Sequence, residues 1–376
     1  MARIDLDLAH AYGPNPQRDE DYALLPLKMT FEDGGAYALL GPSGCGKTTL
    51  LNIVSGLVAP SQGTVAYDGR DVTRLSPQQR NIAQVFQFPV IYDTMTVAQN
   101  LAFPLRNRGV PEDRIKQRVA QVAEMLDMSG QLDQRAAGLA ADAKQKISLG
   151  RGLVREDVSA VLFDEPLTVI DPHLKWQLRR KLKQIHHELK LTLIYVTHDQ
   201  VEALTFAQQV VVMTRGRAVQ VGTASELFER PRHTFVGNFI GSPGMNFLPA
   251  RGLGADIEVA QHRLPTPRPE LAALDAFTLG VRPEYVRLAA PGAAGALPAV
   301  VTQSLDVGTY WLVTARLVPA SSTTAVATSA DAASADTPLL RARLSPEQAI
   351  PAVGQAVWLQ VLGDNTCYYR NEELIA

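Results

Sequence analysis

Short apolar runs alternate with helical patterns along the chain between about residues 30 and 240. The runs YALLG (37–41), AVLFDEP (160–166) and LTLIYVTHD (191–199) are typical of buried strands that end in polar groups. Apolar residues at helical spacing predict a helix over 111–126 and another between the second and third runs. Strands that alternate with helices predict an α/β fold with a parallel sheet.

The pattern changes after GSPGMNFLPA (241–250), where helical periodicity fades and proline and glycine become more frequent. Segments such as FTLGVRPEYVRL (277–288) are β-like. The sequence therefore predicts a first domain over 1–240 and a smaller, β-rich domain over 241–376. Within the second domain, residues 318–337 are small and polar, which predicts a flexible surface loop.

The composition is that of an ordinary globular protein, with 46% hydrophobic and 20% charged residues. A net charge of −2 at pH 7 argues against broad electrostatic capture of nucleic acid, so no nucleic-acid partner is expected. The N-terminus shows no apolar stretch of the kind found in secretory signals, and no apolar run approaches the ~20 residues of a membrane-spanning helix. Cys45 and Cys367 lie far apart, which is typical of a reducing compartment. We expect a cytoplasmic protein that serves a membrane only through a partner.

The segment GPSGCGKTT (41–49) matches the phosphate-binding pattern G-x-x-x-x-G-K-[ST] and lies between an apolar strand and a helical run. Glycines allow backbone N–H groups to curl around phosphate oxygens, and the following helix adds its positive N-terminal dipole. Lys47 is expected to reach the β- and γ-phosphates, and the Thr48 hydroxyl to bind Mg²⁺. The alternative is a glycine-rich turn that binds nothing. The predicted nucleotide-binding residues of this loop are Gly41, Pro42, Ser43, Gly44, Cys45 (as a spacer rather than a catalytic thiol), Gly46, Lys47, Thr48 and Thr49.

Polar side chains stand at the ends of the other predicted strands. Asp164 is expected to hold Mg²⁺ through its water shell, and Glu165 to orient or deprotonate the attacking water; two solvated acids would be the alternative. His198 closes the next strand and is expected to contact the γ-phosphate, unless it is an ordinary structural histidine. Gln87 follows a further apolar strand. The predicted catalytic residues are Glu165, His198 and Gln87, and the predicted Mg²⁺ ligands are Thr48, Gln87 and Asp164.

In this order, the motifs resemble those of the ATP-binding subunits of ABC transporters. The matching positions are Lys47 in Walker A, Gln87 in the Q-loop, Asp164 and Glu165 in Walker B, Asp171 in the D-loop and His198 in the switch. The stretches TLIYVTHDQVEALTFA and GSPGMNFLPA resemble the subunits of maltose and glycerol-3-phosphate importers. The resemblance implies a P-loop NTPase domain with a helical subdomain over about 88–155, followed by an OB-like regulatory domain of the TOBE type.

The resemblance also implies ligands and partners. ATP and Mg²⁺ would be the cofactors, with Tyr12 stacked on the adenine and Tyr22 as the alternative aromatic. Two integral membrane permease subunits would be the direct partners, one coupling helix entering a groove around residues 87–97. A periplasmic solute-binding protein would complete the transporter. The subunit would be peripheral, at the cytoplasmic face of the bacterial inner membrane.

Residues 139–143 read LAADA, where the family usually has Leu-Ser-Gly-Gly-Gln, the signature loop that completes the ATP site of the opposite subunit. Ala140 lacks the serine hydroxyl, and Asp142 adds a negative charge near the γ-phosphate. Asp142 is also expected to be the N-cap of the following helix. The degenerate positions are Ala140, Ala141, Asp142 and Ala143.

These replacements predict one weak half-site. Because a homodimer would place LAADA at both sites, we expect a heterodimer with a different ATPase subunit; harmless drift in a working loop is the alternative. LAADAKQKISLGRGLVR also resembles the altered signature of one ATPase subunit in bacterial glycerol (polyol) importers that use two unlike ATPases, which implies glycerol as cargo. The family resemblance as a whole implies a small solute, a carbohydrate or polyol, with glycerol and glycerol 3-phosphate as candidates. The alternative function is a small-molecule P-loop kinase, which leaves Gln87, His198 and the β-rich domain unexplained.

Overall fold

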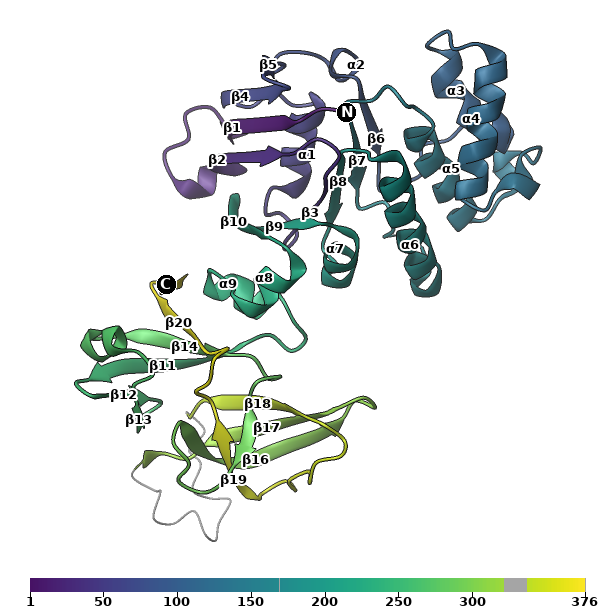
Figure 1. Ribbon diagram of the computed structural model, residues 1–376. Coiled ribbons are helices and arrows are strands. Elements are labelled where there is room, and N and C mark those ends of the chain that lie inside the picture. Colours follow the sequence, from purple (N-terminus) through teal and green to yellow (C-terminus); the bar gives the residue numbers. More distant parts are fainter. Residues whose placement is uncertain (169, 321–336, 376) are drawn as a thin grey trace. The chain divides into compact units, whose positions relative to one another are not determined.

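The computed structural model describes residues 1–168, 170–320 and 337–375. The chain divides into two compact units, Met1–Ala224 and Ser225–Ala376 (Figure 1). Most of the predicted loop over 318–337 lies outside the described residues. Among the helices that the structure describes, none is both long and apolar enough to cross a membrane.

Two sheets form the framework of the first unit. Antiparallel strands make the smaller sheet, in the order β2-β1-β4-β5, and the larger sheet has the order β10-β9-β3-β8-β7-β6. In the larger sheet β9, β3, β8, β7 and β6 are parallel, and β10 is antiparallel at one edge. The strands are β1 (Ile4–His10), β2 (Leu24–Phe31), β3 (Ala36–Leu40), β4 (Gln62–Tyr67), β5 (Arg70–Asp71), β6 (Ile82–Val85), β7 (Ala160–Asp164), β8 (Leu193–Thr197), β9 (Gln209–Thr214) and β10 (Arg217–Gly222).

The larger sheet is buried on both faces, as its continuous apolar strands require. On β7, Val161 and Phe163 pack into a core with the helices, whereas Ala160 and Leu162 face a second core beneath the smaller sheet. Figure 1 shows α3, α4 and α5 grouped together, away from the smaller sheet. The helices are α1 (Lys47–Ser55), α2 (Pro77–Arg80), α3 (Val97–Arg106), α4 (Glu112–Met125), α5 (Ala141–Leu153), α6 (Pro172–Leu189) and α7 (Gln200–Phe206), and the 3-10 turns are η1 (Asp19–Asp21), η2 (Ser129–Gln131) and η3 (Ala136–Gly138).

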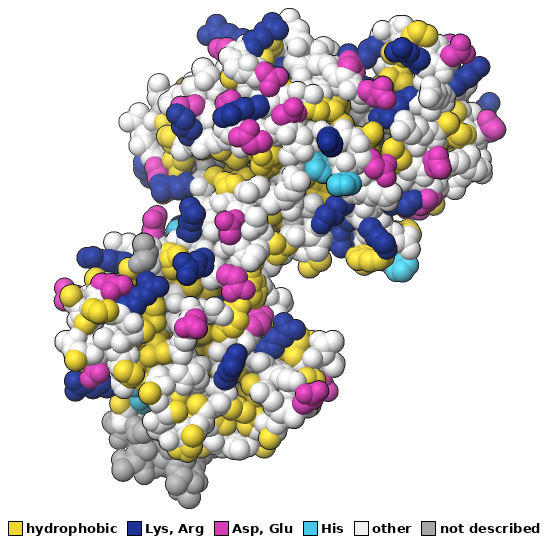
Figure 2. Space-filling model, in the orientation of Figure 1, with side chains coloured by type: hydrophobic (Ala, Val, Ile, Leu, Met, Phe, Trp, Pro, Cys, Tyr) yellow, Lys and Arg dark blue, Asp and Glu magenta, His cyan; other side chains and the backbone are white. Residues whose placement is uncertain are grey.

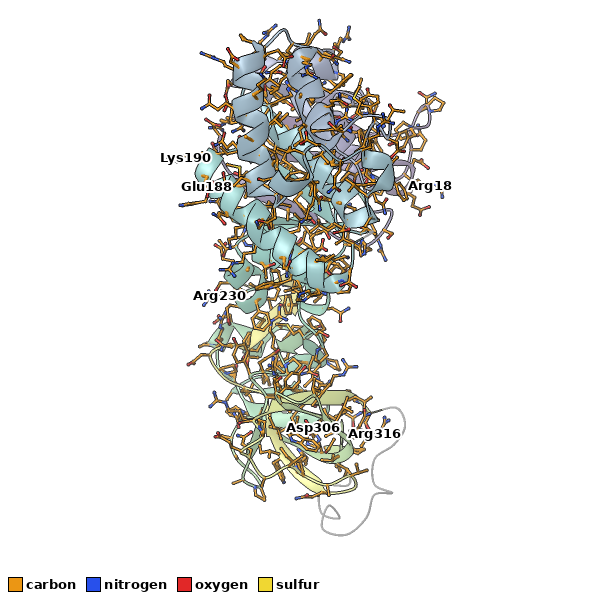
Figure 3. The ribbon with its side chains drawn as sticks, turned by 90° about the vertical axis from the view of Figure 1, so that its right-hand side faces the viewer. Arg18, Glu188, Lys190, Arg230, Asp306 and Arg316 are labelled. Atoms are coloured by element: carbon orange, nitrogen blue, oxygen red, sulfur yellow. The ribbon has the colours of Figure 1, made fainter. Side chains whose placement is uncertain are left out.

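The predicted elements of the first unit are present. The three apolar runs are β3, β7 and β8, and the helix predicted over 111–126 is α4. The second predicted helix is α6, whose C-terminal end is marked by Glu188 and Lys190 in Figure 3. On the face seen in Figure 2, basic and acidic side chains are interspersed over this unit, in keeping with the small net charge.

Arg80 binds the C-terminal end of helix α1. Its side chain is almost fully buried and donates to the carbonyl oxygens of Ile53 and Val54 at the C-terminal end of α1, at 2.7 and 2.8 Å. The Ile53 oxygen also accepts the N–H of the C-cap residue Gly56, and the Val54 oxygen accepts the hydroxyl of Tyr67. A cation is favourable at this end of the helix dipole. The helix that follows the phosphate loop is thus fixed at its C-terminal end.

Two antiparallel sheets form the second unit, in the orders β13-β12-β11-β14-β20-β21 and β15-β19-β16-β17-β18, and they share one apolar core. The β-like run 277–288 is β14 followed by β15. The elements are α8 (Ala224–Glu229), α9 (Thr234–Phe239), η4 (Pro269–Ala273), β11 (Asn246–Leu253), β12 (Asp256–Val259), β13 (His262–Pro265), β14 (Phe277–Val281), β15 (Arg287–Ala289), β16 (Ala296–Asp306), β17 (Trp311–Leu317), β18 (Leu339–Leu344), β19 (Ala356–Gln360), β20 (Cys367–Arg370) and β21 (Glu373–Leu374).

The second unit begins before the predicted boundary at residue 240, because α8 and α9 pack with the β-rich part. Arg282, which is fully buried, donates to the carbonyl oxygens of Leu227 and Phe228 in α8 and of Ile240 after α9. The guanidinium also lies 4.0 Å from the centroid of the Phe228 ring. Helical periodicity alone assigned this segment to the first domain, since it gives no information on which unit the helices contact.

Candidate nucleotide site

The loop between β3 and α1 carries the phosphate-binding pattern. At two of its glycines, any larger residue would clash with neighbouring backbone. A Cβ on Gly41 would lie 2.2 Å from the carbonyl oxygen of Met213. Gly46 has a left-handed φ of 101° as the N-cap of α1, and a Cβ there would lie 2.5 Å from the carbonyl oxygen of Ala23. The glycines therefore let the loop pass close to neighbouring backbone and turn into the helix, whose N-terminus favours anions.

The ammonium group of Lys47 is held inside this loop. Its side chain is buried, and Nζ donates to the carbonyl oxygens of Gly41 and Pro42, both at 2.9 Å. The Cys45 thiol lies 3.9 Å from the same nitrogen, and burial raises its pKa above the usual range. A raised pKa keeps the thiol protonated and unreactive, as expected of a spacer residue.

Thr48 and Asp164 meet across the start of α1 and the end of β7. The Thr48 hydroxyl donates to Oδ1 of Asp164 at 3.2 Å. Burial raises the pKa of the Asp164 carboxyl, although Thr48 and Lys47 partly oppose this shift. A hydroxyl and a carboxylate are hard oxygen ligands, and Mg²⁺ typically binds to one or two such groups together with phosphate and water. The Thr48–Asp164 pair therefore fits a Mg²⁺ ion that is bound together with a nucleotide.

Glu165 and His198 are brought together at the ends of two adjacent strands. β7 and β8 are parallel, with Asp164 opposite Val196, so both side chains emerge at the same edge of the sheet. His198 Nδ1 lies 3.1 Å from Oε2 of Glu165, and the Thr168 hydroxyl donates to that oxygen at 3.3 Å. Glu165 also has a left-handed φ of 47°, a strained conformation that often accompanies functional side chains.

Glu202 supports the segment that carries His198, and it was missed in the sequence analysis. Its carboxylate is buried and accepts hydrogen bonds from the hydroxyls of Tyr195 (3.0 Å) and Thr197 (2.8 Å). Lys175 of α6 lies 3.7 Å from the other oxygen. The signal in the sequence was an acid one helical turn after His198, but nothing in the pattern indicated that it was buried.

Tyr12 follows β1 and reaches the phosphate-loop helix. Its hydroxyl lies 3.1 Å from that of Thr49, yet 68% of the residue is exposed. The His10 ring packs against it at a centroid distance of 4.6 Å. The segment beyond Tyr12 projects outward, as the labelled Arg18 shows in Figure 3. An exposed aromatic ring is thus held beside the first turn of α1.

Comparison with known proteins agrees with this geometry. Residues 24–168 match the ABC transporter family, and residues 279–339 match the TOBE domain. The sn-glycerol-3-phosphate import ATP-binding protein UgpC of Cereibacter sphaeroides is 46% identical over 263 residues, which cover 70% of this chain and 74% of the relative. The chain belongs to the ATP-binding proteins of ABC importers. It is therefore an ATPase with a C-terminal TOBE domain.

Further relatives agree. The protein of the same name from Chromohalobacter salexigens is 41% identical over 310 residues, covering 81% of this chain and 82% of the relative. Among solved structures, cbiO1 from Clostridium perfringens, described as part of the ABC transporter complex cbiONQ, has a TM-score of 0.55 and 26% identity. That match covers 61% of this ABC protein and 90% of cbiO1.

The signature segment of this ABC protein differs from the prediction at the start of α5. The N-cap is Ala140, with extended backbone angles (φ −66°, ψ 163°) and no side-chain cap, and Lys144 N–H already donates to its carbonyl oxygen at 3.0 Å. The prediction that Asp142 is the N-cap was wrong, because the helix begins at Ala141 and places Asp142 in its first turn. Asp142 instead lines a small cleft together with Lys146, also on α5, and with side chains of α6 such as Gln177 and Lys181.

The remaining predicted positions lie on neighbouring elements. Asp171 is the N-cap of α6 and accepts a hydrogen bond from the N–H of His173 at 2.9 Å. Gln87 follows β6, which is parallel to β7, so it leaves the sheet at the edge where Asp164 lies. The roles of Gln87 and Asp171 toward nucleotide stay predictions.

An apolar strip follows Gln87 on the surface. Four large side chains between residues 86 and 92 are exposed, and the most exposed, Phe88, reaches 68%. Tyr92 packs on Phe103, and the guanidinium of Arg151 lies 4.8 Å from the centroid of the Tyr92 ring. Buried Asn100 holds this segment through hydrogen bonds with the N–H and carbonyl groups of Tyr92. The exposed members of the strip are Phe86, Phe88, Val90 and Tyr92.

Proposed function

We propose that this chain binds and hydrolyses MgATP at the site between α1, β7 and β8 and thereby energises the import of a polyol or its phosphate. The observation that carries the proposal is the convergence of two pairs at one sheet edge, Thr48 with Asp164 and Glu165 with His198, beside the phosphate loop. Each pair supplies a different part of phosphoryl transfer, metal binding in the first and activation of water in the second.

In this mechanism the Lys47 ammonium exchanges its loop carbonyl partners for the β- and γ-phosphate oxygens. Glu165 accepts a proton from the water whose oxygen attacks the γ-phosphorus, and the bond to the leaving ADP oxygen breaks. His198 orients the Glu165 carboxylate through the 3.1 Å contact and approaches the same phosphate. Mg²⁺, held by Thr48 and Asp164, would neutralise charge on the β- and γ-phosphates.

The signature loop supports pairing with an unlike ATPase subunit. In this family each ATP is completed by the signature of the opposite subunit, and a homodimer of this chain would offer LAADA at both sites. Ala140 stands at the N-cap, where the usual serine would offer a hydroxyl, and loss of one hydrogen bond to a charged group costs about 1.5–3 kcal/mol. The N–H groups of the first turn of α5 have no side-chain cap, so the loop retains weak phosphate donors.

The transported solute and the other partners complete the proposal. Relatives named for sn-glycerol-3-phosphate import favour glycerol 3-phosphate or glycerol as cargo. The apolar strip from Phe86 to Tyr92 is the surface for a coupling helix from one of two membrane permease subunits, which hold the chain at the cytoplasmic face of the bacterial inner membrane. A periplasmic solute-binding protein delivers the solute to those subunits.

Purification of the native complex tests these assignments together. We expect a tagged copy of this chain to co-purify from membranes with one unlike ATPase subunit in equal amount and with two permease subunits, as measured by quantitative mass spectrometry. With the solute-binding protein added, glycerol or glycerol 3-phosphate, but not maltose, should stimulate ATP turnover. A complex in which this chain is the only ATPase would refute the heterodimer, and stimulation by maltose alone would refute the cargo.

A further inference from the structure

His10 is a buried polar residue that no assigned function uses. It is the last residue of β1 and only 6% exposed, and neither ring nitrogen has a hydrogen-bond partner in the described part of the chain. A buried polar group without a partner destabilises a fold. Burial also lowers the pKa of the ring, which favours its neutral form.

The backbone of His10 is firmly placed, whereas Tyr12 lies beyond the sheet. His10 pairs with Leu24 across the antiparallel β1–β2 ladder, and its carbonyl oxygen accepts the N–H of Ala23 at 2.9 Å. Tyr12 has left the strand. The His10 ring, whose backbone is paired in the sheet, thus contacts the ring of Tyr12, whose backbone lies outside the sheet.

The two rings meet nearly at right angles. Their centroids are 4.6 Å apart and their planes differ by 86°, the edge-to-face arrangement that aromatic rings favour. The Tyr12 hydroxyl meets Thr49 at 3.1 Å. The exposed Tyr12 ring is therefore held at two places, by its hydroxyl on the phosphate-loop helix and by the His10 ring on the sheet.

We propose that His10 is a positioning residue that fixes the Tyr12 ring in the orientation in which it receives the nucleotide base. The pair then sets the affinity for the base and leaves the affinity for the phosphates to Lys47 and its loop. This inference rests on the proposed binding of ATP at this site and on the expectation, implied by the family resemblance, that Tyr12 stacks on the adenine.

Binding of two ligands to the full-length chain separates the contributions of base and phosphates. ATP uses both Tyr12 and the phosphate loop, whereas inorganic tripolyphosphate uses the loop alone. Loss of an edge-to-face pair predicts that His10→Ala weakens ATP binding about three- to tenfold in isothermal titration calorimetry. Tripolyphosphate binding should stay within about twofold of wild type, since the phosphate loop is unchanged.

Two further variants separate positioning from packing. His10→Phe keeps an aromatic ring and should retain ATP affinity, whereas His10→Leu fills the space without a ring and should lose affinity as His10→Ala does. Equal losses for both ligands, or equal ATP affinities of the Phe and Leu variants, would show that His10 serves the fold only. If His10→Ala does not fold, the comparison of Phe with Leu decides the question.

Tyr12→Ala distinguishes failure of this inference from failure of the proposed function. It should weaken ATP binding and spare tripolyphosphate. If Tyr12→Ala leaves ATP affinity unchanged while Lys47→Ala removes it, the base is not read by Tyr12, although the phosphate site stands. If Tyr12→Ala weakens ATP binding and His10→Ala does not, only the positioning role of His10 is refuted.

Discussion

Glu165→Gln is expected to leave ATP bound while turnover in the assembled transporter falls by on the order of a hundred- to ten-thousandfold. Glutamine is nearly isosteric with glutamate and keeps a carbonyl oxygen near His198, but its amide does not accept the proton of the attacking water. The measurement pairs phosphate release at saturating ATP with equilibrium ATP binding by the same variant.

A matched substitution controls for the chemical change. Glu124→Gln makes the same replacement at an exposed position of α4, outside the site, and should leave both binding and turnover unchanged. Wild-type turnover in the Glu165→Gln variant would show that another group accepts the proton. Loss of ATP binding instead of turnover would assign Glu165 to nucleotide binding.

Lys47→Ala is expected to weaken ATP binding by on the order of a hundredfold or more, because it removes charge-assisted hydrogen bonds to two phosphates, each worth about 1.5–3 kcal/mol. The substitution also leaves the carbonyl oxygens of Gly41 and Pro42 without their present donor. Thermal unfolding should therefore be recorded beside calorimetric ATP binding, so that a loss of fold is not taken for a loss of affinity.

Lys28→Ala provides the control for the loss of a lysine charge. Lys28 lies on β2 with a highly exposed side chain that is 3.6 Å from Asp7. Its removal should not change ATP affinity, since surface ion pairs contribute little. ATP affinity that is unchanged in Lys47→Ala would mean that the phosphate loop is misassigned.

The grouping of the candidate site residues at one edge of the sheet could be predicted from the sequence, because these residues belong to local patterns at strand ends. The glycine pattern at 41–49 lies between a strand and a helix, and Asp164, Glu165 and His198 directly follow apolar runs. Parallel strands bring such ends to one edge, which is why residues far apart in the chain form pairs. The predicted strands and helices of the first unit were confirmed because they too are local patterns, apolar runs for the strands and helical periodicity for the helices.

Features set by tertiary contact could not be predicted. The buried state of Glu202 and the contact between His10 and Tyr12 depend on how neighbouring elements pack. The N-cap of α5 was predicted at Asp142, because aspartate is favoured at N-caps, but it is Ala140, two residues earlier. The second compact unit begins at Ser225, earlier than the predicted boundary, because Arg282, directly after β14, donates hydrogen bonds to carbonyl oxygens of α8 and of Ile240 after α9.

We propose that this ATPase is limited by its signature loop and needs a competent signature from a partner subunit to complete its own ATP site. Rebuilding the loop with Ala140→Ser, Ala141→Gly, Asp142→Gly and Ala143→Gln tests it directly in the isolated chain. The new serine would occupy the N-cap position of α5, which Ala140 holds now, and would supply the hydroxyl that the usual signature loop offers to the nucleotide. Ala137→Ser, outside the loop on the exposed turn η3, is the matched control.

The decisive measurement is ATP turnover by the purified chain with the wild-type, rebuilt and control sequences. We expect slow turnover by wild type and by Ala137→Ser, and a gain of roughly tenfold or more in the rebuilt chain, the equivalent of one recovered hydrogen bond to a charged phosphate. Rapid turnover by ATP-dependent homodimers of the wild-type chain, with no gain on rebuilding, would contradict the account and make LAADA a working signature.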